Sequence, residues 1–149
     1  MRLMYLPAKQ EDIGPICDLS RQLIDRYEDV DAIPYDKVLA WMENKVRESI
    51  DDYRRILCDG LVAGYFHLSD TDDGRLELDD FYVLPPYRSK GIGTEVLTEI
   101  LANTDQDVML YVFERNEGAI RLYERMGFVT EKTVGQTRRI MVKRKESNE

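Results

Sequence analysis

Three acidic side chains lie close together in the otherwise apolar stretch LELDDFYV, residues 76–83: Glu77, Asp79 and Asp80. A carboxylate can take a proton from an ammonium group, whose pKa of about 10.4 prevents it from acting as a nucleophile near neutral pH. A buried carboxylate also needs a charged or hydrogen-bonding partner, because burying an unpaired charge is costly. The stretch therefore indicates either a general base that activates an amine or a set of ion pairs.

The two alternatives differ in what these carboxylates meet. Alternation along a strand places Glu77 and Asp79 on one face and Asp80 on the other, unless a β-bulge turns Asp80 round. The structural partners that the sequence offers are arginines at positions 54, 55 and 75. The residues alone leave both alternatives open, and they do not select which acid would be the base.

A second stretch with chemical potential is RSKGIG, residues 88–93, between this predicted strand and a predicted helix. The amide N–H groups in the first turn of a helix, together with the helix dipole, favour an anion. Gly91 and Gly93 would let an anion approach the backbone closely, and Arg88 and Lys90 add positive charge. The spacing excludes a Walker loop and a dinucleotide-binding fingerprint. Another phosphate-bearing ligand is one interpretation, and a tight turn with solvated cations is the other.

Hydrophobic periodicity predicts the elements that position these residues. Strands are predicted near residues 2–6, 53–58, 61–69, 76–84, 107–113, 128–134 and 137–143, and helices near 11–24, 38–50, 92–101 and 117–126. An Asp-Gly pair at 59–60 is typical of a hairpin turn. Asn116 suits a helix N-cap, and Gly127 suits the position just past a helix end. We expect one domain over residues 1–149, with a frayed tail at 143–149.

The short helix carries a further motif. Asn116, Ala119, Tyr123 and Gly127 follow each other at steps of three, four and four, with Phe128 directly after. With RSKGIG about thirty residues earlier, the chain resembles the GNAT superfamily of acyl-CoA-dependent N-acyltransferases, and the order of elements agrees over essentially its whole length. The resemblance implies a single GNAT domain of the α/β (α+β) class. Its sheet would be mixed and mostly antiparallel, with about six to seven strands flanked by about four helices.

The resemblance also implies acetyl-CoA as cosubstrate, no metal, and direct attack by the amine without a covalent acyl-enzyme. The pyrophosphate would be held by the loop and first helical turn, comprising Arg88, Ser89, Lys90, Gly91, Ile92, Gly93 and Thr94. The backbone of Phe81, Tyr82 and Val83 would hold the pantetheine arm, and the Val83 amide would polarise the thioester carbonyl. Tyr123 would protonate the departing thiolate, Glu77 or Asp79 would be the base, and Asn116 would contact the cofactor.

Charge is distributed unevenly along the chain. Residues 1–83 carry 10 Lys/Arg and 19 Asp/Glu, a net of −9, whereas residues 84–149 carry 11 and 10, a net of +1; the whole chain has −8. This balance argues against a nucleic-acid partner. At Glu28 and Asp79 the chain resembles the diamine (polyamine) acetyltransferase branch, which implies a small cationic amine held by Glu28, Asp79 and Asp80. Tyr35 and Trp41 could line that site, although a Trp on an apolar helix stripe is more often core.

Other functions and partners stay open at this point. The chain could instead acetylate a protein or peptide, or it could be a non-catalytic acyl-CoA-binding regulatory domain. We expect no membrane segment and a cytoplasmic location, because no apolar run of about twenty residues and no signal peptide are recognisable. Homodimers are common in the superfamily, so the resemblance leaves a homodimer open. His67 is expected to be structural.

Overall fold

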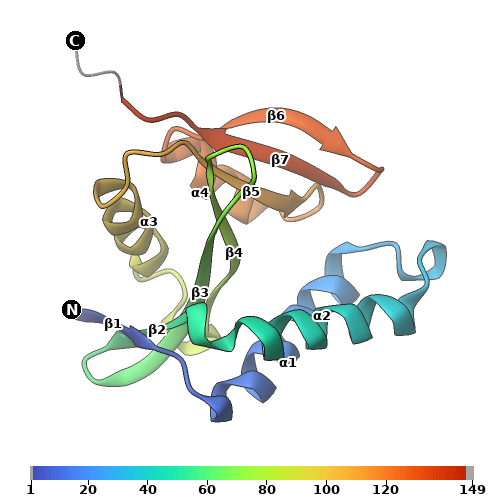
Figure 1. Cartoon of the computed structure of the whole chain (residues 1–149), viewed down its shortest axis with the longest axis horizontal. Coiled ribbons are helices and arrows are strands. Elements are labelled where there is room, and N and C mark those ends of the chain that lie inside the picture. Colours follow the sequence, from blue (N-terminus) through green and yellow to red (C-terminus); the bar gives the residue numbers. More distant parts are fainter. Residues whose placement is uncertain (1, 147–149) are drawn as a thin grey trace. The chain divides into compact units, whose positions relative to one another are not determined.

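A computed structural model describes residues 2–146 of the chain (Figure 1). The strands are β1 (Leu3–Pro7), β2 (Tyr53–Cys58), β3 (Leu61–Asp70), β4 (Leu76–Val83), β5 (Val108–Phe113), β6 (Val129–Val134) and β7 (Arg138–Lys143). The α-helices are α1 (Ile13–Tyr27), α2 (Tyr35–Ser49), α3 (Ile92–Ala102) and α4 (Glu117–Arg125). Each predicted helix and strand is present at the predicted place, and the α/β fold class is confirmed.

The strands form one sheet in the order β1-β2-β3-β4-β5-β7-β6. The pairs β1–β2, β2–β3, β5–β7 and β6–β7 are antiparallel, whereas β4 and β5 are parallel. A parallel pair needs a long crossover between its strands, and α3 supplies it here. The predicted mixed, mostly antiparallel sheet is thereby confirmed.

The chain divides into two compact units, which we call the first and the second unit. The first comprises Met1–His67 with Asp80–Tyr82, and the second comprises Leu68–Asp79 with Val83–Glu149. Strand β4 contributes residues to both units. The expectation of one domain over residues 1–149 stays a prediction.

In the first unit, α1 and α2 lie side by side (Figure 1) and contact each other. Both helices bury an apolar stripe, which comprises Ile13, Ile16, Leu19 and Ile24 of α1 and Met42 and Val46 of α2. Trp41 does not belong to this stripe, because 66% of it is exposed. The alternative that Trp41 is a core residue is therefore wrong. The hairpin turn between β2 and β3 has the expected form, with positive φ at both Asp59 and Gly60.

In the second unit, β5 buries three consecutive residues, Val108, Met109 and Leu110. A strand with both faces covered has this pattern, as its continuous apolar sequence suggests. Met109 packs in one cluster with Ile140 and Val142 of β7. The tail expected to fray from residue 143 begins later, since Lys143 is still part of β7. Residues 147–149 of that tail lie outside the described residues.

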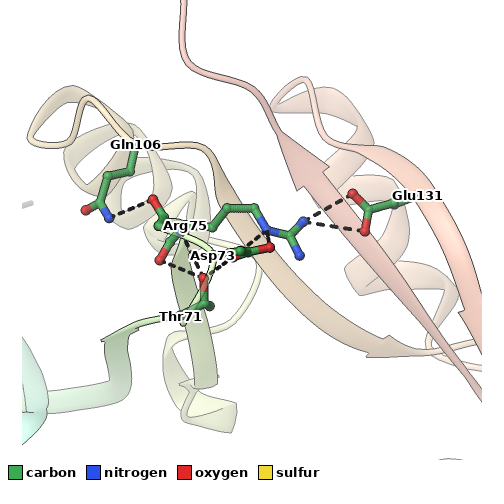
Figure 2. Close-up of polar contacts among 6 residues, drawn as sticks. Thr71, Asp73, Arg75, Gln106 and Glu131 are labelled. Carbon is green, nitrogen blue, oxygen red and sulfur yellow. Dashed lines mark hydrogen bonds and ion pairs between the residues drawn. The ribbon is translucent and has the colours of Figure 1, made fainter.

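A polar network in the second unit fixes the turn that precedes β4 (Figure 2). The guanidinium group of Arg75 lies 3.0 Å from a carboxylate oxygen of Asp73 and 3.1 Å from one of Glu131, on β6. The Thr71 hydroxyl accepts the Arg75 backbone N–H at 2.9 Å, and Gln106 donates to the carbonyl of Gly74 at 3.1 Å. The turn is therefore tied to β6 and to the segment before β5, all within one unit.

Candidate active site

Strand β4 departs from regular strand geometry at Asp80. This residue has φ +47°, in the left-handed region that few residues other than glycine adopt, although aspartate tolerates it better than most. In the parallel pairing of β4 with β5, Leu76 pairs with Val108 and Glu77 pairs with Met109. The regular conformation of β4 is therefore interrupted at Asp80. A β-bulge that turns Asp80 round stays a prediction, which this positive φ supports.

Asp80 lies in a polar cluster of the first unit. Its side chain is only 6% exposed, and its Oδ2 lies 3.1 Å from the ammonium nitrogen of Lys45 on α2. The hydroxyl of Tyr53 donates to the same oxygen, and the hydroxyl of Tyr82 donates to Oδ1 at 2.7 Å. The Tyr53 ring in turn stacks on His67, with ring centroids 4.4 Å apart and planes 4° from parallel. Asp80 therefore has a cation and two hydroxyl groups around its carboxylate.

Neither Lys45 nor Tyr53 was among the residues predicted for the site. They are 35 and 27 positions from Asp80 in the chain, and nothing in their local sequence relates them to β4. His67 is buried, as a structural strand residue would be.

The other two acids of β4, Glu77 and Asp79, belong to the second unit and are both half-buried. Of the arginines proposed as their structural partners, Arg75 is held by Asp73 and Glu131. Arg55 is held by Glu11 and Asp12, both at 2.7 Å. Arg54 donates to the backbone carbonyls of Asp51 and Tyr53. The choice between Glu77 and Asp79 as base stays a prediction.

The loop between β4 and α3 has the backbone form expected of an anion cradle. Ser89 and Gly91 both have positive φ, +62° and +82°, and Gly91 is the N-cap of α3. Glycine has no side chain that could accept the N–H groups of the first helical turn, so these donors remain for another acceptor. A Cβ atom at position 91 would meet nothing within 4 Å, so space on that side is open.

Arg88 has a definite role in this loop. Its Nε–H donates to the backbone carbonyl of Val83 at 2.9 Å, which ties the loop to the end of β4. Lys90 is exposed beside it. Two cations next to open amide donors suit a polyanion such as a pyrophosphate.

Helix α4 explains the spacing of the second motif. The Asn116 side chain accepts the Ala119 N–H at 3.3 Å, which confirms its role as N-cap. At the other end, the Phe128 N–H donates to the Tyr123 carbonyl and the Gly127 N–H to the Glu124 carbonyl, both at 3.0 Å. These two bonds form a Schellman motif with Gly127 at φ +93°.

The Schellman motif positions Tyr123. Its two end residues, Tyr123 and Phe128, bring their rings to 5.6 Å between centroids. Such an apolar contact commonly accompanies the motif. The spacing of four residues from Tyr123 to Gly127 and five to Phe128 is therefore the spacing that a Schellman motif needs to end this helix. The same motif helps to bury Tyr123, which is 8% exposed. Burial raises the pKa of the Tyr123 phenol above its usual range, so the group keeps its proton at neutral pH.

On the first unit, Glu28 follows α1 directly as its C-cap, and its carboxylate accepts the Asp29 N–H at 3.2 Å. Beside this helix end lies an open hollow of about 330 Å³, lined by Asp25, Val30, Asp31 and Tyr35. The Tyr35 hydroxyl donates to Asp25 at 2.5 Å. The connection between α1 and α2 is thus acidic and concave.

Known proteins resemble this chain in sequence and in fold. Residues 19–128 match the family model described as the acetyltransferase (GNAT) family. The chain belongs to the GNAT family. Within residues 2–146, no three His, Cys, Asp or Glu side chains are grouped so that they could hold a metal ion. None of the described helices has the length and apolar character needed to cross a membrane.

Two curated relatives are named for the amines that they acetylate. Over 64 residues, the chain is 36% identical to the spermine/spermidine N(1)-acetyltransferase of Bacillus subtilis (strain 168), covering 40% of this chain and 42% of that protein. Over 75 residues, it is 35% identical to the thialysine N-epsilon-acetyltransferase of Mus musculus, covering 45% and 44%. The GNAT chain thus spans less than half the length of these two relatives.

Solved structures support the fold over nearly the whole chain. A PaiA N-acetyltransferase from Thermoplasma acidophilum, in complex with coenzyme A, has a TM-score of 0.71 at 21% identity and covers 97% of this chain and 99% of its own. A GNAT acetyltransferase from Streptococcus agalactiae has a TM-score of 0.75 at 15% identity, covering 97% and 96%. At these identities the likeness establishes the GNAT fold alone.

Proposed function

We propose that this GNAT protein transfers an acetyl group from acetyl-CoA to the primary amine of a small cationic acceptor. The observation that carries the proposal is the loop before α3. Positive φ at Ser89 and Gly91 and a side-chain-free N-cap leave the first-turn amides open to an anion. The relative in complex with coenzyme A and the family match support acetyl-CoA as that ligand.

The chemistry follows from residues of the second unit. Acetyl-CoA supplies an activated thioester. Glu77 or Asp79 takes the proton of the acceptor ammonium, directly or through water, and so exposes the nitrogen lone pair. The amine then attacks the thioester carbonyl, while the backbone N–H of Val83 stabilises the oxygen that gains charge. As the C–S bond breaks, Tyr123 donates its proton to the leaving sulfur. The new C–N bond leaves the nitrogen with one proton more than the amide product carries, and this proton passes through water to the Tyr123 phenolate, which restores the phenol.

The acidic surface of the first unit supports a cationic acceptor. Glu28 stands at the end of α1, next to a hollow that contains Asp25 and Asp31. Carboxylates in a concave surface attract cations and raise their encounter rate. Relatives named for spermine, spermidine and thialysine point in the same direction. We therefore infer a diamine or polyamine rather than a neutral amine.

The test is release of free thiol from acetyl-CoA by the purified protein against separate amines: diamines, polyamines, amino acids, aminoglycosides and short peptides. Turnover of diamines is the expected result. Turnover of peptides alone would still support acetyl transfer, but it would show that the acceptor is a protein or peptide and not a small amine. Tight binding of acetyl-CoA with no turnover of any acceptor would instead support a non-catalytic regulatory domain.

A substitution at Glu28 tests the acceptor site separately. Glu28→Gln removes one charge beside the hollow, so the KM for a diamine should rise about three- to tenfold with kcat little changed. Glu48→Gln removes the same charge from an exposed position on α2 and serves as the matched control. Equal KM values for the two variants would exclude Glu28 from the acceptor site.

A further inference from the structure

The ammonium group of Lys45 meets a carboxylate and an aromatic ring. It lies 3.1 Å from Oδ2 of Asp80, inside the first unit, and 5.5 Å from the centroid of the Trp41 indole. The Lys45 side chain is 22% exposed and that of Asp80 is 6% exposed, whereas Trp41 is 66% exposed. Lys45 thus connects a buried carboxylate with an aromatic ring at the surface.

The groups around Lys45 are those that bind an alkylammonium ion. A carboxylate gives a charge-assisted hydrogen bond, and the face of an indole attracts a cation. The carboxylate is also fixed before any ligand arrives, because Tyr53 and Tyr82 hold its two oxygens. Tyr53 is fully buried and stacked on His67, so its hydroxyl has little freedom to move.

The backbone supports a functional reading of this cluster. Asp80 is held at φ +47° in the strand that also carries Glu77 and Asp79. Left-handed non-glycine residues cost free energy and persist where the surroundings fix them, most often at functional sites. A simple surface ion pair needs neither this conformation nor two tyrosine hydroxyls.

We propose that Lys45 is a specificity-determining residue: its ammonium group holds the cation position at Asp80, and an acceptor with a second ammonium group has to displace it. The inference rests on the proposed acetyl transfer to a cationic amine and adds the residue that selects the charge of the acceptor. When it is displaced from Asp80, the Lys45 ammonium can keep its cation–π contact with the Trp41 indole, because the two residues are one helical turn apart on α2.

The experiment compares a diamine with a monoamine of equal chain length, 1,4-diaminobutane with 1-aminobutane. Binding of each is measured by calorimetry, and kcat/KM is measured at saturating acetyl-CoA. Lys45→Met keeps the apolar length of the side chain and removes its charge, so the preference for the diamine should rise about tenfold, as expected for one partly buried ion pair. Lys45→Arg should keep the wild-type preference for the diamine. The double variant Lys45→Met/Asp80→Asn should also show the wild-type preference, because it lacks the carboxylate that the second ammonium group would bind.

Lys37→Met is the matched control, because it removes the same charge from an exposed position on the same helix. A diamine preference in Lys45→Met no higher than in Lys37→Met would overturn the inference. The binding data keep it separate from the proposed function. One outcome separates the two proposals: no variant acetylates any amine, but Lys45→Met still binds the diamine more tightly than the wild type does. The proposed acetyl transfer would then be wrong, whereas the proposed cation position at Asp80 would hold.

A second measurement uses the wild-type protein and does not depend on how well Lys45→Met folds. The rate at which an amine-reactive reagent labels Lys45 is followed by mass spectrometry. The labelling of Lys45 is divided by that of the exposed Lys37 in the same sample, so that reagent consumed by the free amine cancels. Saturating 1,4-diaminobutane should increase this ratio at least twofold relative to 1-aminobutane at equal concentration, because it releases Lys45 from Asp80. Equal ratios in both amines would contradict displacement.

Discussion

At the scale of single residues, Tyr123 combines a fixed position with a fixed protonation state. The Schellman bonds at the end of α4 and the contact with Phe128 hold its ring, and burial raises the pKa of its phenol. A general acid has to carry its proton when the thiolate leaves. A phenol whose pKa is raised carries that proton across the whole neutral and mildly alkaline range.

Tyr123→Phe should therefore lower kcat by about 10²- to 10⁴-fold and leave the KM for acetyl-CoA within about twofold, because the ring contact remains while the proton is lost. Tyr111→Phe, at an exposed position of β5, is the control and should change neither constant. Wild-type kcat should show no loss near pH 10 from this group, since its raised pKa keeps it protonated there. A wild-type kcat in Tyr123→Phe would exclude Tyr123 as the general acid.

Asp12 shows how a buried carboxylate stabilises the first unit. It is 3% exposed and accepts from Arg55 Nε at 2.7 Å, the Lys9 N–H at 2.7 Å and the Tyr65 hydroxyl at 2.9 Å. Burial by itself raises the pKa of Asp12, but these three hydrogen bonds outweigh it and leave the pKa below its usual value. The ionised form therefore favours the folded state.

Asp12→Asn should cost about 3 kcal/mol of unfolding free energy at pH 7, because it leaves the Arg55 charge with one partner fewer. The stabilisation by Asp12 is complete above its unfolded pKa of about 3.9 and is lost as the pH falls through the lower folded value. Urea unfolding at pH 7 and below pH 4 measures both effects, and the variant should lose less stability on acidification. Asp18→Asn, in an exposed pair with Arg21, should cost under about 0.5 kcal/mol; an equal loss in both variants would contradict the argument.

At the scale of elements, the junction of β4 and α3 depends on backbone conformation more than on side chains. Gly91 has φ +82° as the N-cap of α3, and an alanine there would meet open space but would strain the backbone. The strain costs roughly 1–2 kcal/mol. Because the proposed ligand binds the amides that this conformation exposes, part of that cost should appear in binding.

Gly91→Ala should accordingly raise the Kd for coenzyme A about tenfold, which calorimetry can measure. Gly14→Ala is the control, because Gly14 lies in α1 at ordinary φ with open space around a new Cβ. This control should stabilise the protein by about 0.5–1 kcal/mol and leave the Kd unchanged. An unchanged Kd in Gly91→Ala would show that the loop does not hold the cofactor.

At the scale of the whole molecule, the charge of the chain is divided along its length. Net charge is −9 over residues 1–83 and +1 over residues 84–149. This division matches the proposed ligands, a cationic acceptor for the acidic part and a polyanionic cosubstrate for the rest. Long-range attraction of this kind weakens with salt, because the Debye length falls from about 30 Å at 0.01 M to about 10 Å at 0.1 M.

At saturating acetyl-CoA, kcat/KM for a diamine should fall at least about threefold between these two ionic strengths. The fall for a monoamine of equal length should be clearly smaller, because it carries half the charge. Measuring both acceptors in the same buffers separates the attraction of the acceptor from general effects of salt on the enzyme. Equal falls for the two amines would contradict electrostatic attraction of the acceptor.

The sequence by itself determined the order of helices and strands, the N-cap at Asn116, the helix end at Gly127 and the GNAT family. These features depend on neighbours within a few residues, through hydrophobic periodicity, capping and the conformational freedom of glycine, so a single chain records them directly. Only the tertiary structure showed that Asp80 turns into the left-handed region and meets Lys45, Tyr53 and Tyr82. It also showed that Trp41 lies at the surface. Contacts between residues tens of positions apart are set by the packing of elements, which no local pattern around Lys45 or Trp41 encodes.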